Sequence, residues 1–357
     1  RRRRCGEFRA GGIGSRRPLV VTSTTIALCG AGMISGVHAA AARALGFPLV
    51  AVASRTPTRS ATRAAEWGCR AVTYEDLPNR ADVVIVASPP GSHYDHAAHA
   101  LERGAAVIVE KPLVTTLRDA DRLCVLGDRY PHRLLYAENL IFAPSVRRML
   151  ALVPEIGSLS HLSLRTVQSR PTWGGFLESD WGGGVLFDLG VHPLALAVLI
   201  GRRCGAGEIV GVEARLHGDE VDTDAHVTIH FANGVRASLH VSWEGPEIPS
   251  WDVQLASASS VLRLELLPTV SLEHDGESLD LATEPHGLVQ HLGYVDQLRL
   301  GLEAFRRAQP SPSDAHFGRW ILEIVSACYV SASRHGERVD VPSGCDRSLT
   351  PHELWRG

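Results

Sequence analysis

Lysine is nearly absent from this 357-residue chain: of its 36 basic residues only Lys111 is a lysine, and the rest are arginines. We attribute the bias to a GC-rich genome in which arginine codons replace lysine codons wherever the chemistry permits. A position that keeps lysine in such a chain is a candidate for a role that needs a compact ammonium. The alternative, a surface salt bridge, is weaker because arginine serves that purpose everywhere else in this sequence.

Cysteine pairs and long apolar runs are also missing. The seven cysteines are odd in number and scattered, without a C-x-x-C pair, which argues against a disulfide framework and a structural zinc site and favours a reducing, cytoplasmic location. No run of 18 apolar residues occurs, so no membrane span is expected. A net charge of -3 gives no electrostatic reason to expect nucleic acid or an anionic membrane as partner. The expected partner is a small molecule.

The N-terminal stretch allows two interpretations. Ser15-Arg16-Arg17 before the apolar run 19–28 resembles a twin-arginine export signal. The other interpretation is a disordered, arginine-rich extension over residues 1–22, or a mis-assigned start. We favour the second, because the apolar run continues directly into a glycine-rich turn that belongs to the fold, and cleavage would remove the first strand.

The composition, 45% hydrophobic and 21% charged, is that of a globular protein, and the length suits two domains. From Thr24 onward, short apolar runs alternate with helix-like stretches. Strands are expected at 25–29, 49–53, 71–73, 83–87 and 106–109, with helices at 34–45, 60–66 and 93–103. Buried strands separated by helices predict a parallel sheet covered on both faces. Residues 23–140 are therefore predicted to form a Rossmann-type, doubly wound dinucleotide-binding domain.

The sequence pattern changes in residues 141–357, where longer strands with alternating burial are expected. They are expected at 158–168, 208–216, 225–231, 235–243, 252–256, 261–266 and 270–274. Asn233-Gly234 between two of these runs is a strong hairpin signal. Helical periodicity follows at 288–307 and 315–334. The second domain should be α+β, with a largely antiparallel sheet and helices that cover it or pack back on the first domain.

The first strand runs into Gly30-Ala31-Gly32-Met33-Ile34-Ser35, in the strand, turn and helix order of a dinucleotide fingerprint. Gly30 permits the tight turn, and Gly32 lets a pyrophosphate approach the backbone. The helix that begins at Met33 and Ile34 offers free N–H groups and its positive dipole end. An ordinary glycine turn is the alternative, and the strand–turn–helix context makes it the weaker one.

The second strand ends in Ala53-Ser54-Arg55-Thr56, without the acid that usually binds the ribose hydroxyls of NAD. A carboxylate would repel a 2′-phosphate, whereas the Ser54 hydroxyl and the Arg55 guanidinium can bind one. The sequence therefore predicts NADP, with NAD still possible. The alternative is that Arg55 is a solvated loop arginine.

Two further strand ends carry polar residues. The fourth strand is followed by Ser88, Pro89 and His93, and the fifth by Glu110 and Lys111. Because ligands bind at the carboxyl ends of such strands, these residues are expected at the cofactor cleft. There the Lys111 ammonium could hydrogen-bond the substrate oxygen and stabilise developing alkoxide charge.

In the second half, Gly182-Gly183-Gly184 leads to Asp188 and His192, which are four residues apart. This spacing predicts one face of a helix. A histidine next to a carboxylate suits proton transfer at neutral pH. The same spacing also fits a surface pair or two metal ligands, but no third ligand follows at helical spacing, so no metal is expected.

Together these motifs resemble those of the Gfo/Idh/MocA family, named after glucose-fructose oxidoreductase, inositol dehydrogenase and a rhizopine-catabolism protein. The resemblance covers residues 24–342 and depends on the glycine turn, on Glu110-Lys111-Pro112 and on 182–192. It implies a Rossmann domain followed by a domain whose open, mostly antiparallel sheet forms the interface of a homo-oligomer, a dimer or tetramer. It also implies a cis Lys111-Pro112 peptide.

The resemblance further implies roles at the reacting centre. Lys111 and His192 would flank the substrate carbon that faces the nicotinamide, with Asp188 beside them. His192 would be the general acid/base and Lys111 the residue that stabilises the alkoxide. The chain departs from the family pattern at Ser35, which replaces a third glycine, and at Ala195, where inositol dehydrogenases carry an acid.

Pro193 directly follows His192 and predicts a local kink there. Residues on segments leading to the active helix are candidates for the substrate pocket, with core or surface positions as the alternative for each. They are Glu138, Asn139, Arg170, Trp173 and Trp181.

The leading hypothesis is an NADP-dependent oxidoreductase of a sugar, cyclitol or sugar-derived ketone, with reduction favoured because NADPH usually serves reduction. One alternative is a dinucleotide-sensing regulator without catalysis on the same fold. Another is an enzyme of a non-sugar substrate, such as a dihydrodiol or a tetrapyrrole.

Overall fold

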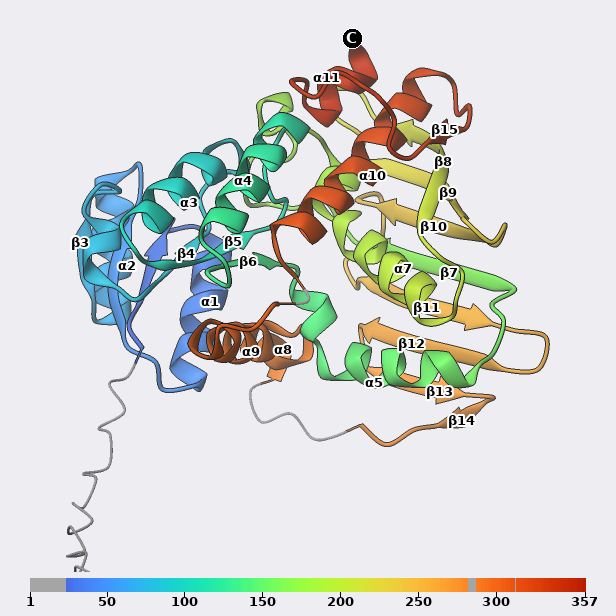
Figure 1. The fold of residues 1–357 in the computed structure, drawn as a ribbon, viewed down its shortest axis with the longest axis horizontal. Coiled ribbons are helices and arrows are strands. Elements are labelled where there is room, and N and C mark those ends of the chain that lie inside the picture. The colour runs from blue at the N-terminus through green and yellow to red at the C-terminus, as the bar shows by residue number, and fades with distance from the viewer. Residues whose placement is uncertain (1–23, 282–286, 312) are drawn as a thin grey trace, which may run out of the picture.

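The computed structural model describes residues 24–281, 287–311 and 313–357, and the predicted extension at 1–22 lies outside the described residues. Two sheets lie side by side, each with helices against it (Figure 1). The first has the strand order β3-β2-β1-β4-β5-β6, and all its neighbours are parallel. Its strands are β1 (Ile26–Cys29), β2 (Leu49–Ala53), β3 (Arg70–Val72), β4 (Val83–Val86), β5 (Ala106–Glu110) and β6 (Leu134–Ala137).

Helices α1 (Met33–Ala44), α2 (Pro57–Trp67), α3 (His93–Glu102) and α4 (Leu117–Arg129) alternate with these strands. β1, β4 and β5 are fully buried, as expected for apolar strands with helices on both faces. The doubly wound prediction is confirmed. β6 was not predicted, although its residues are also buried and mostly apolar. The strand order reverses between β1 and β4, and ligands bind at the carboxyl ends of strands at such a point.

The second sheet has nine strands, in the order β14-β13-β12-β11-β7-β10-β9-β8-β15. Only β7 and β10 pair in parallel, and the remaining neighbours are antiparallel. All seven predicted strands are present: β7 (His161–Val167), β8 (Ile209–His217), β9 (Asp224–Phe231), β10 (Arg236–Ser242), β11 (Ser250–Ala256), β12 (Val261–Leu267) and β13 (Ser271–His274). The two-residue strands β14 (Glu277–Ser278) and β15 (Val339–Asp340) were not predicted.

One face of this sheet is covered and the other is open. Helices α5 (Pro144–Leu152), α7 (Val191–Arg203) and α10 (Ala315–Ser333) pack against the side nearer the first sheet (Figure 1). Along β9, Ala225, Val227, Ile229 and Phe231 are buried, whereas the residues between them are partly or fully exposed. Because side chains alternate along a strand, these polar residues lie on the open face.

The C-terminal helices connect the two sheets. α10 packs on α4 and β6 as well as on β8, and α9 (Tyr294–Arg307) packs on α1. The single helix predicted at 288–307 is wrong, since Gly293 at φ +85° separates α9 from α8 (Gly287–His291). A Cβ on Gly293 would lie 2.2 Å from the Asn139 carbonyl oxygen, so the close packing there requires glycine.

The remaining helices are short. α6 (Val185–Asp188) precedes α7, and α11 (Pro351–Arg356) begins in a capping box of Thr350 and Glu353. Single 3-10 turns lie at Leu77–Arg80, Pro90–Ser92, Asn139–Phe142, Val153–Glu155 and Ser179–Trp181.

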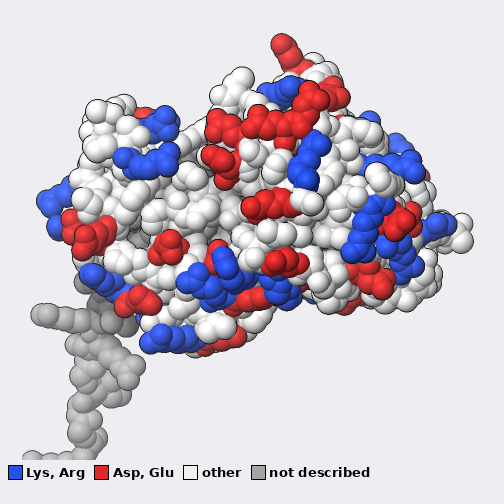
Figure 2. All heavy atoms as spheres, turned by 90° about the horizontal axis from the view of Figure 1, so that it is seen from above, with Lys and Arg blue, Asp and Glu red and all other residues white. Residues whose placement is uncertain are grey.

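Among the described residues, no single helix has the length and apolarity to cross a membrane. Only the pair Ser179–Asp188 and Val191–Arg203, bent by 47°, reaches that length and composition together. Most residues of Val191–Arg203 are buried in the protein core. On the face seen in Figure 2, acidic and basic side chains lie interspersed rather than in a patch of one sign.

Candidate active site

The turn after β1 has the features of a pyrophosphate-binding turn. Gly30 has φ +132°, and a Cβ there would lie 2.2 Å from the Ala87 carbonyl oxygen, so only glycine fits. A Cβ on Gly32 would meet no atom within 4 Å, and the first turn of α1 carries no acid. Open space over the N–H groups that begin at Met33 and Ile34 suits an anionic pyrophosphate. These residues therefore fit a dinucleotide.

The end of β2 carries the residues predicted to select the cofactor. The Ser54 hydroxyl accepts a hydrogen bond of 3.2 Å from the backbone of Thr56. The backbone N–H of Arg55 donates to the Tyr74 hydroxyl at 2.9 Å. The Arg55 side chain is exposed, and no hydrogen bond or ion pair with another described residue engages its guanidinium.

His93 ties together the turns after β4 and β5. Its Nε2 lies 2.8 Å from the Ser88 carbonyl oxygen and its Nδ1 lies 3.0 Å from that of Pro112. Complete burial lowers the pKa of this imidazole. Both nitrogens lie against backbone carbonyl oxygens, and a neutral imidazole donates to one of them, so the imidazole joins the turn that contains Ser88 and Pro89 to the turn after β5. The cofactor contact predicted for His93 stays a prediction.

Glu110, at the end of β5, is also bonded within the protein. One carboxylate oxygen lies 2.6 Å from Nε2 of the buried His38 in α1, and the other accepts from the Lys111 backbone at 2.9 Å. Burial acts to raise the pKa of Glu110, but His38 and Lys111 hold it below its usual value. The carboxylate thereby joins α1 to the strand end, and its predicted cofactor contact also stays a prediction.

The Lys111 side chain extends from the end of β5 to Asp188, which lies at the end of α6. Its Nζ donates to the Asp188 carboxylate at 2.6 Å and to the Asp188 carbonyl at 3.1 Å, with the Phe176 ring centroid at 5.6 Å. Burial acts to lower the pKa of Lys111. The Asp188 carboxylate and, to a smaller extent, those of Glu110 and Glu138 outweigh burial and raise this pKa above its ordinary value. Lys111 is therefore an ammonium at neutral pH, with 13% of its side chain exposed. The Lys111-Pro112 peptide is cis, as the resemblance implied.

Asp188 and His192 do not share a helix, so that prediction is wrong. Asp188 ends α6, and α7 begins at Val191 after a break at Leu189 and Gly190. A Cβ on Gly190 would lie 2.4 Å from the Leu186 carbonyl oxygen, so the bend requires glycine. The bend precedes His192, and the expected kink is therefore before Pro193 rather than at it.

The carboxylate beside His192 is that of Glu138, not Asp188 as predicted. Nδ1 of His192 lies 2.6 Å from Oε1 of Glu138, and both residues are buried. No hydrogen bond with another described residue engages Nε2 of His192. The Trp251 ring centroid lies 5.9 Å from that of the imidazole. The site thus contains two pairs, Lys111–Asp188 and Glu138–His192.

The other predicted pocket residues divide into buried and exposed. Asn139 is buried and donates to the Leu292 carbonyl at 2.6 Å, which is a structural tie. Arg170 is exposed and lies 3.7 Å from Glu244. Trp173 is 47% exposed. Trp181 packs on Phe176 with ring centroids 4.8 Å apart, and this places it near Lys111 through the same ring.

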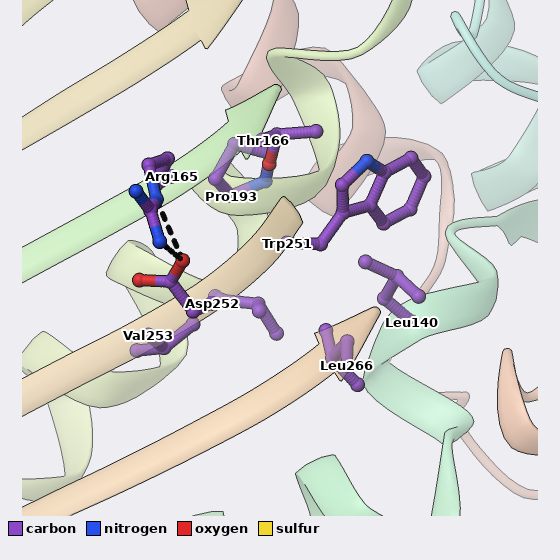
Figure 3. Close-up of a pocket in the computed structure, with 9 residues that line it drawn as sticks. Leu140, Arg165, Thr166, Pro193, Trp251, Asp252, Val253 and Leu266 are labelled. Carbon is purple, nitrogen blue, oxygen red and sulfur yellow. Dashed lines mark hydrogen bonds and ion pairs between the residues drawn. The ribbon is translucent and has the colours of Figure 1, made fainter. Parts of the chain in front are cut away.

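A small pocket lies beside the start of α7, lined by Leu140, Pro193 and Trp251 among others. Figure 3 shows Trp251 extending from β11 toward Leu140, with the Arg165–Asp252 ion pair on the other side. The pocket has room for about one water molecule and is too small for a sugar ring. It is therefore not the substrate site, although Trp251, which lines it, also packs near the His192 imidazole.

Comparisons with known proteins agree with this geometry. Residues 24–137 match the model described as the oxidoreductase family, NAD-binding Rossmann fold. Residues 146–255 match the model of the GFO/IDH/MocA C-terminal domain, so that the two models together cover more than half of the chain. The chain belongs to the GFO/IDH/MocA family.

Several family members with names are similar to this chain. A dTDP-3,4-didehydro-2,6-dideoxy-alpha-D-glucose 3-reductase of Saccharopolyspora spinosa is 38% identical over 42% of this chain and 47% of its own length. A 3-reductase of the same name from Actinomadura kijaniata is 28% identical over 81% and 88%. Across the first curated relatives, the matched stretch is about half of the relative's own length. The crystal structure of GenD2 from gentamicin A biosynthesis, in complex with NAD, has a TM-score of 0.78 and 25% identity, covering 92% of this chain and 99% of that one.

In this GFO/IDH/MocA protein, sequence reasoning missed the residues that hold the glycine run in place. The buried Asp222 carboxylate accepts from the backbone of Gly184 at 2.9 Å and of Leu186 at 2.8 Å, and the Tyr329 hydroxyl donates to it at 2.5 Å. These bonds satisfy free N–H groups at the start of α6. Asp222 is 34 residues beyond Asp188, and no local pattern connects the two.

Proposed function

We propose that this protein is an NADP(H)-dependent oxidoreductase that interconverts a secondary alcohol and a ketone on a sugar or sugar derivative. The observation that carries the proposal is the pairing of Lys111 with Asp188 and of His192 with Glu138. Because the first curated relatives match over about half their length, the activity and the substrate class are inferences from this chemistry. The names of the relatives support a sugar, and reduction of a keto sugar is the favoured direction.

Lys111 would bind the substrate oxygen. An ammonium has three N–H donors, of which two are engaged by the carboxylate and the carbonyl of Asp188. The third is left for the carbonyl or hydroxyl oxygen at the reacting carbon. The positive charge, held by a raised pKa, would stabilise the alkoxide that develops there. Gly30, Gly32 and the start of α1 would hold the pyrophosphate of a dinucleotide, whose nicotinamide would supply or accept the hydride.

His192 would move the proton. In the tautomer that donates from Nδ1 to Glu138, Nε2 is free to exchange a proton with the substrate oxygen. Glu138 keeps the imidazole in this tautomer and orientation, as the buried aspartate does in hydrolytic triads. Glu138 is therefore a positioning residue in this proposal, and the substrate contact predicted for it stays a prediction.

The proposal is tested with a panel of dTDP-linked and free keto sugars, glucosides and cyclitols, followed by the absorbance of reduced nicotinamide with NADPH and with NADH. We expect turnover of at least one keto sugar with NADPH. NADPH binding without turnover of any panel member would instead favour a dinucleotide-sensing regulator. Turnover of a non-sugar diol alone would overturn the substrate class.

The proposed NADP preference depends on two features at the end of β2. The Arg55 guanidinium is exposed and makes no hydrogen bond or ion pair with another described residue, and no acid follows the strand. A charge-assisted hydrogen bond to the 2′-phosphate contributes about 1.5–3 kcal/mol. Arg55→Ala should therefore lower kcat/KM for NADPH by roughly 10- to 100-fold and leave that for NADH unchanged. Arg43→Ala, at the far end of α1, is the matched control. A wild-type preference for NADH would contradict this proposal.

The homo-oligomer and the cytoplasmic location stay predictions.

A further inference from the structure

Three side chains with metal-binding atoms meet on the open face of the nine-stranded sheet, away from the candidate active site. Asp224 and His226 come from β9, and His240 comes from the neighbouring strand β10. His226 and His240 are directly opposite each other in the antiparallel register. One carboxylate oxygen and one nitrogen from each imidazole all lie within 4.8 Å of one another.

The three groups are arranged around the Asp224 carboxylate. Nε2 of His240 lies 2.9 Å from Oδ1, and Nε2 of His226 lies 3.2 Å from Oδ2. The two imidazoles are stacked, with ring centroids 4.2 Å apart and planes at 8°. Both histidines therefore direct the same ring nitrogen toward one carboxylate, and none of the three points into the protein core.

We propose that Asp224, His226 and His240 form a binding site for a divalent transition-metal ion, with Zn²⁺ as its first candidate. Imidazole nitrogen is a ligand that suits Zn²⁺ rather than Mg²⁺ or Ca²⁺, and Zn²⁺ also binds carboxylate oxygen. Three protein ligands leave a fourth tetrahedral position for water or for a group from another molecule.

The ligand atoms are near enough to share one ion. Zinc–ligand bonds of about 2.0–2.1 Å place neighbouring ligand atoms about 3.3 Å apart in a tetrahedron. The distances from the two histidines to the Asp224 oxygens, 2.9 and 3.2 Å, are close to this value. Because the rings are stacked with planes at 8°, one ion cannot lie in both ring planes, so the more exposed His226 imidazole must turn out of the stack for both histidines to bind it. Metal binding would replace the hydrogen bond between His240 and the carboxylate and the ion-pair contact of His226 with it, and each imidazole would carry its proton on Nδ1 instead.

Backbone structure holds the ligands in place. β9 and β10 form a hairpin whose loop, residues 232–234, is closed by a hydrogen bond from the Phe231 N–H to the Val235 carbonyl. Asp224 has 16% of its side chain exposed, whereas that of His226 is 59% exposed. The site is thus built on rigid strands and open to solvent on one side, so an ion can enter without unfolding the sheet.

The test uses the full chain, freed of metal with a chelator and dialysed against ZnCl₂. We expect one Zn²⁺ per chain at micromolar concentration. Asp224→Asn, His226→Asn and His240→Asn should each weaken binding at least tenfold. The matched control is His161→Asn, an exposed histidine at the start of β7 on the same open face, which should leave binding unchanged.

Two further measurements separate loss of the site from loss of the fold. Each variant should bind NADPH and melt without Zn²⁺ at the same temperature as the unmodified chain. The proposal is overturned if the unmodified chain binds no Zn²⁺ at micromolar concentration. It is also overturned if the three variants bind as well as the unmodified chain, or if His161→Asn reduces binding to the same extent as they do.

Discussion

At the scale of single residues, the structure gives a physical reason for the one lysine. Lys111 donates to both a carboxylate and a carbonyl of Asp188, in two directions from one nitrogen. An ammonium can rotate to meet both acceptors and still offer a third N–H. A guanidinium is a planar fork whose donors point in fixed directions. Arginine would therefore not replace lysine here, although it does so throughout the rest of the chain.

The Glu138–His192 pair leads to a prediction about a residue that does not touch the substrate. In Glu138→Gln the side chain keeps its shape but loses the charge that stabilises a protonated imidazole. We expect kcat to fall about 10- to 100-fold, because proton transfer by a positioned base contributes about 10²–10⁴-fold. KM and the affinity for NADPH should stay unchanged. Steady-state kinetics measure kcat and KM, and NADPH fluorescence titration measures the affinity.

Glu155→Gln, an exposed acid at the end of a 3-10 turn, is the matched control for this experiment. It should leave kcat unchanged. If Glu138→Gln lowers NADPH affinity or raises KM while kcat stays intact, Glu138 contacts a ligand directly and the positioning role is wrong.

The sequence predicts candidate residues for the chemistry but not which of them pair. Lys111, Asp188 and His192 stand out through their type and their motifs. Glu138 lies 54 residues from His192 along the chain, and Lys111 lies 77 residues from Asp188. Such contacts are set by how the two sheets pack, and helical spacing alone led to the wrong partner for His192.

At the scale of elements, glycine contacts overrode helical periodicity twice. The apolar pattern through 185–203 continues across Gly190, yet the helix breaks there because the backbone approaches Leu186 closely. Gly293 breaks the stretch at 288–307 by its close approach to Asn139. Periodicity describes which face is buried, but not whether the backbone bends between two turns.

The hairpin is a case in which the sequence predicted the loop as well as the strands. The expected strands at 225–231 and 235–243, with Asn233-Gly234 between them, leave a three-residue loop. The structure has this loop, so His230 pairs with Arg236 and His226 with His240. A shift of one residue would move His240 to the opposite face. No metal was expected, because the spacing that suggested ligands was the helical one of Asp188 and His192 and not this cross-strand pairing.

The docking of α3 leads to a prediction about pH. His96 packs on Tyr74 and its Nδ1 lies 2.9 Å from the Ser88 hydroxyl. Burial and, to a smaller extent, the neighbouring His93 lower the pKa of His96 to about 4. Since the unfolded chain binds this proton near pH 6.5, the folded state is favoured above that pH. Its advantage is lost as the pH falls toward 4.

We therefore expect the free energy of unfolding to decrease from pH 7 to pH 5, and His96→Gln to reduce this decrease by about 1.5 kcal/mol. Urea unfolding at the two pH values measures it. His316→Gln, an exposed histidine on α10, serves as the control and should not change the pH dependence. An unchanged decrease in His96→Gln would show that this imidazole titrates normally in the folded state.

At the scale of the whole molecule, the sequence predicted two sheets of the right kinds but not how they are joined. Fully apolar strands indicated the parallel sheet, and alternating strands indicated the antiparallel one, because these patterns depend only on local burial. The packing of α10 on α4, β6 and β8 depends on contacts between distant segments. This packing brings the Lys111 end of β5 to the break between α6 and α7.

We propose that this assembled site transfers a hydride with the help of the Lys111 ammonium. The most direct measurement uses NADPH deuterated at nicotinamide C4, a keto sugar that the panel identifies, and mass analysis of the product. The variant carries Lys111→Met and Asp188→Asn together, so that neither charge is left buried without its partner.

We expect deuterium on the former carbonyl carbon in the unmodified protein. In the double variant we expect a rate about 10²–10³-fold lower, with NADPH affinity unchanged. Full transfer by the double variant, or tight NADPH binding by the unmodified protein without any transfer, would contradict it.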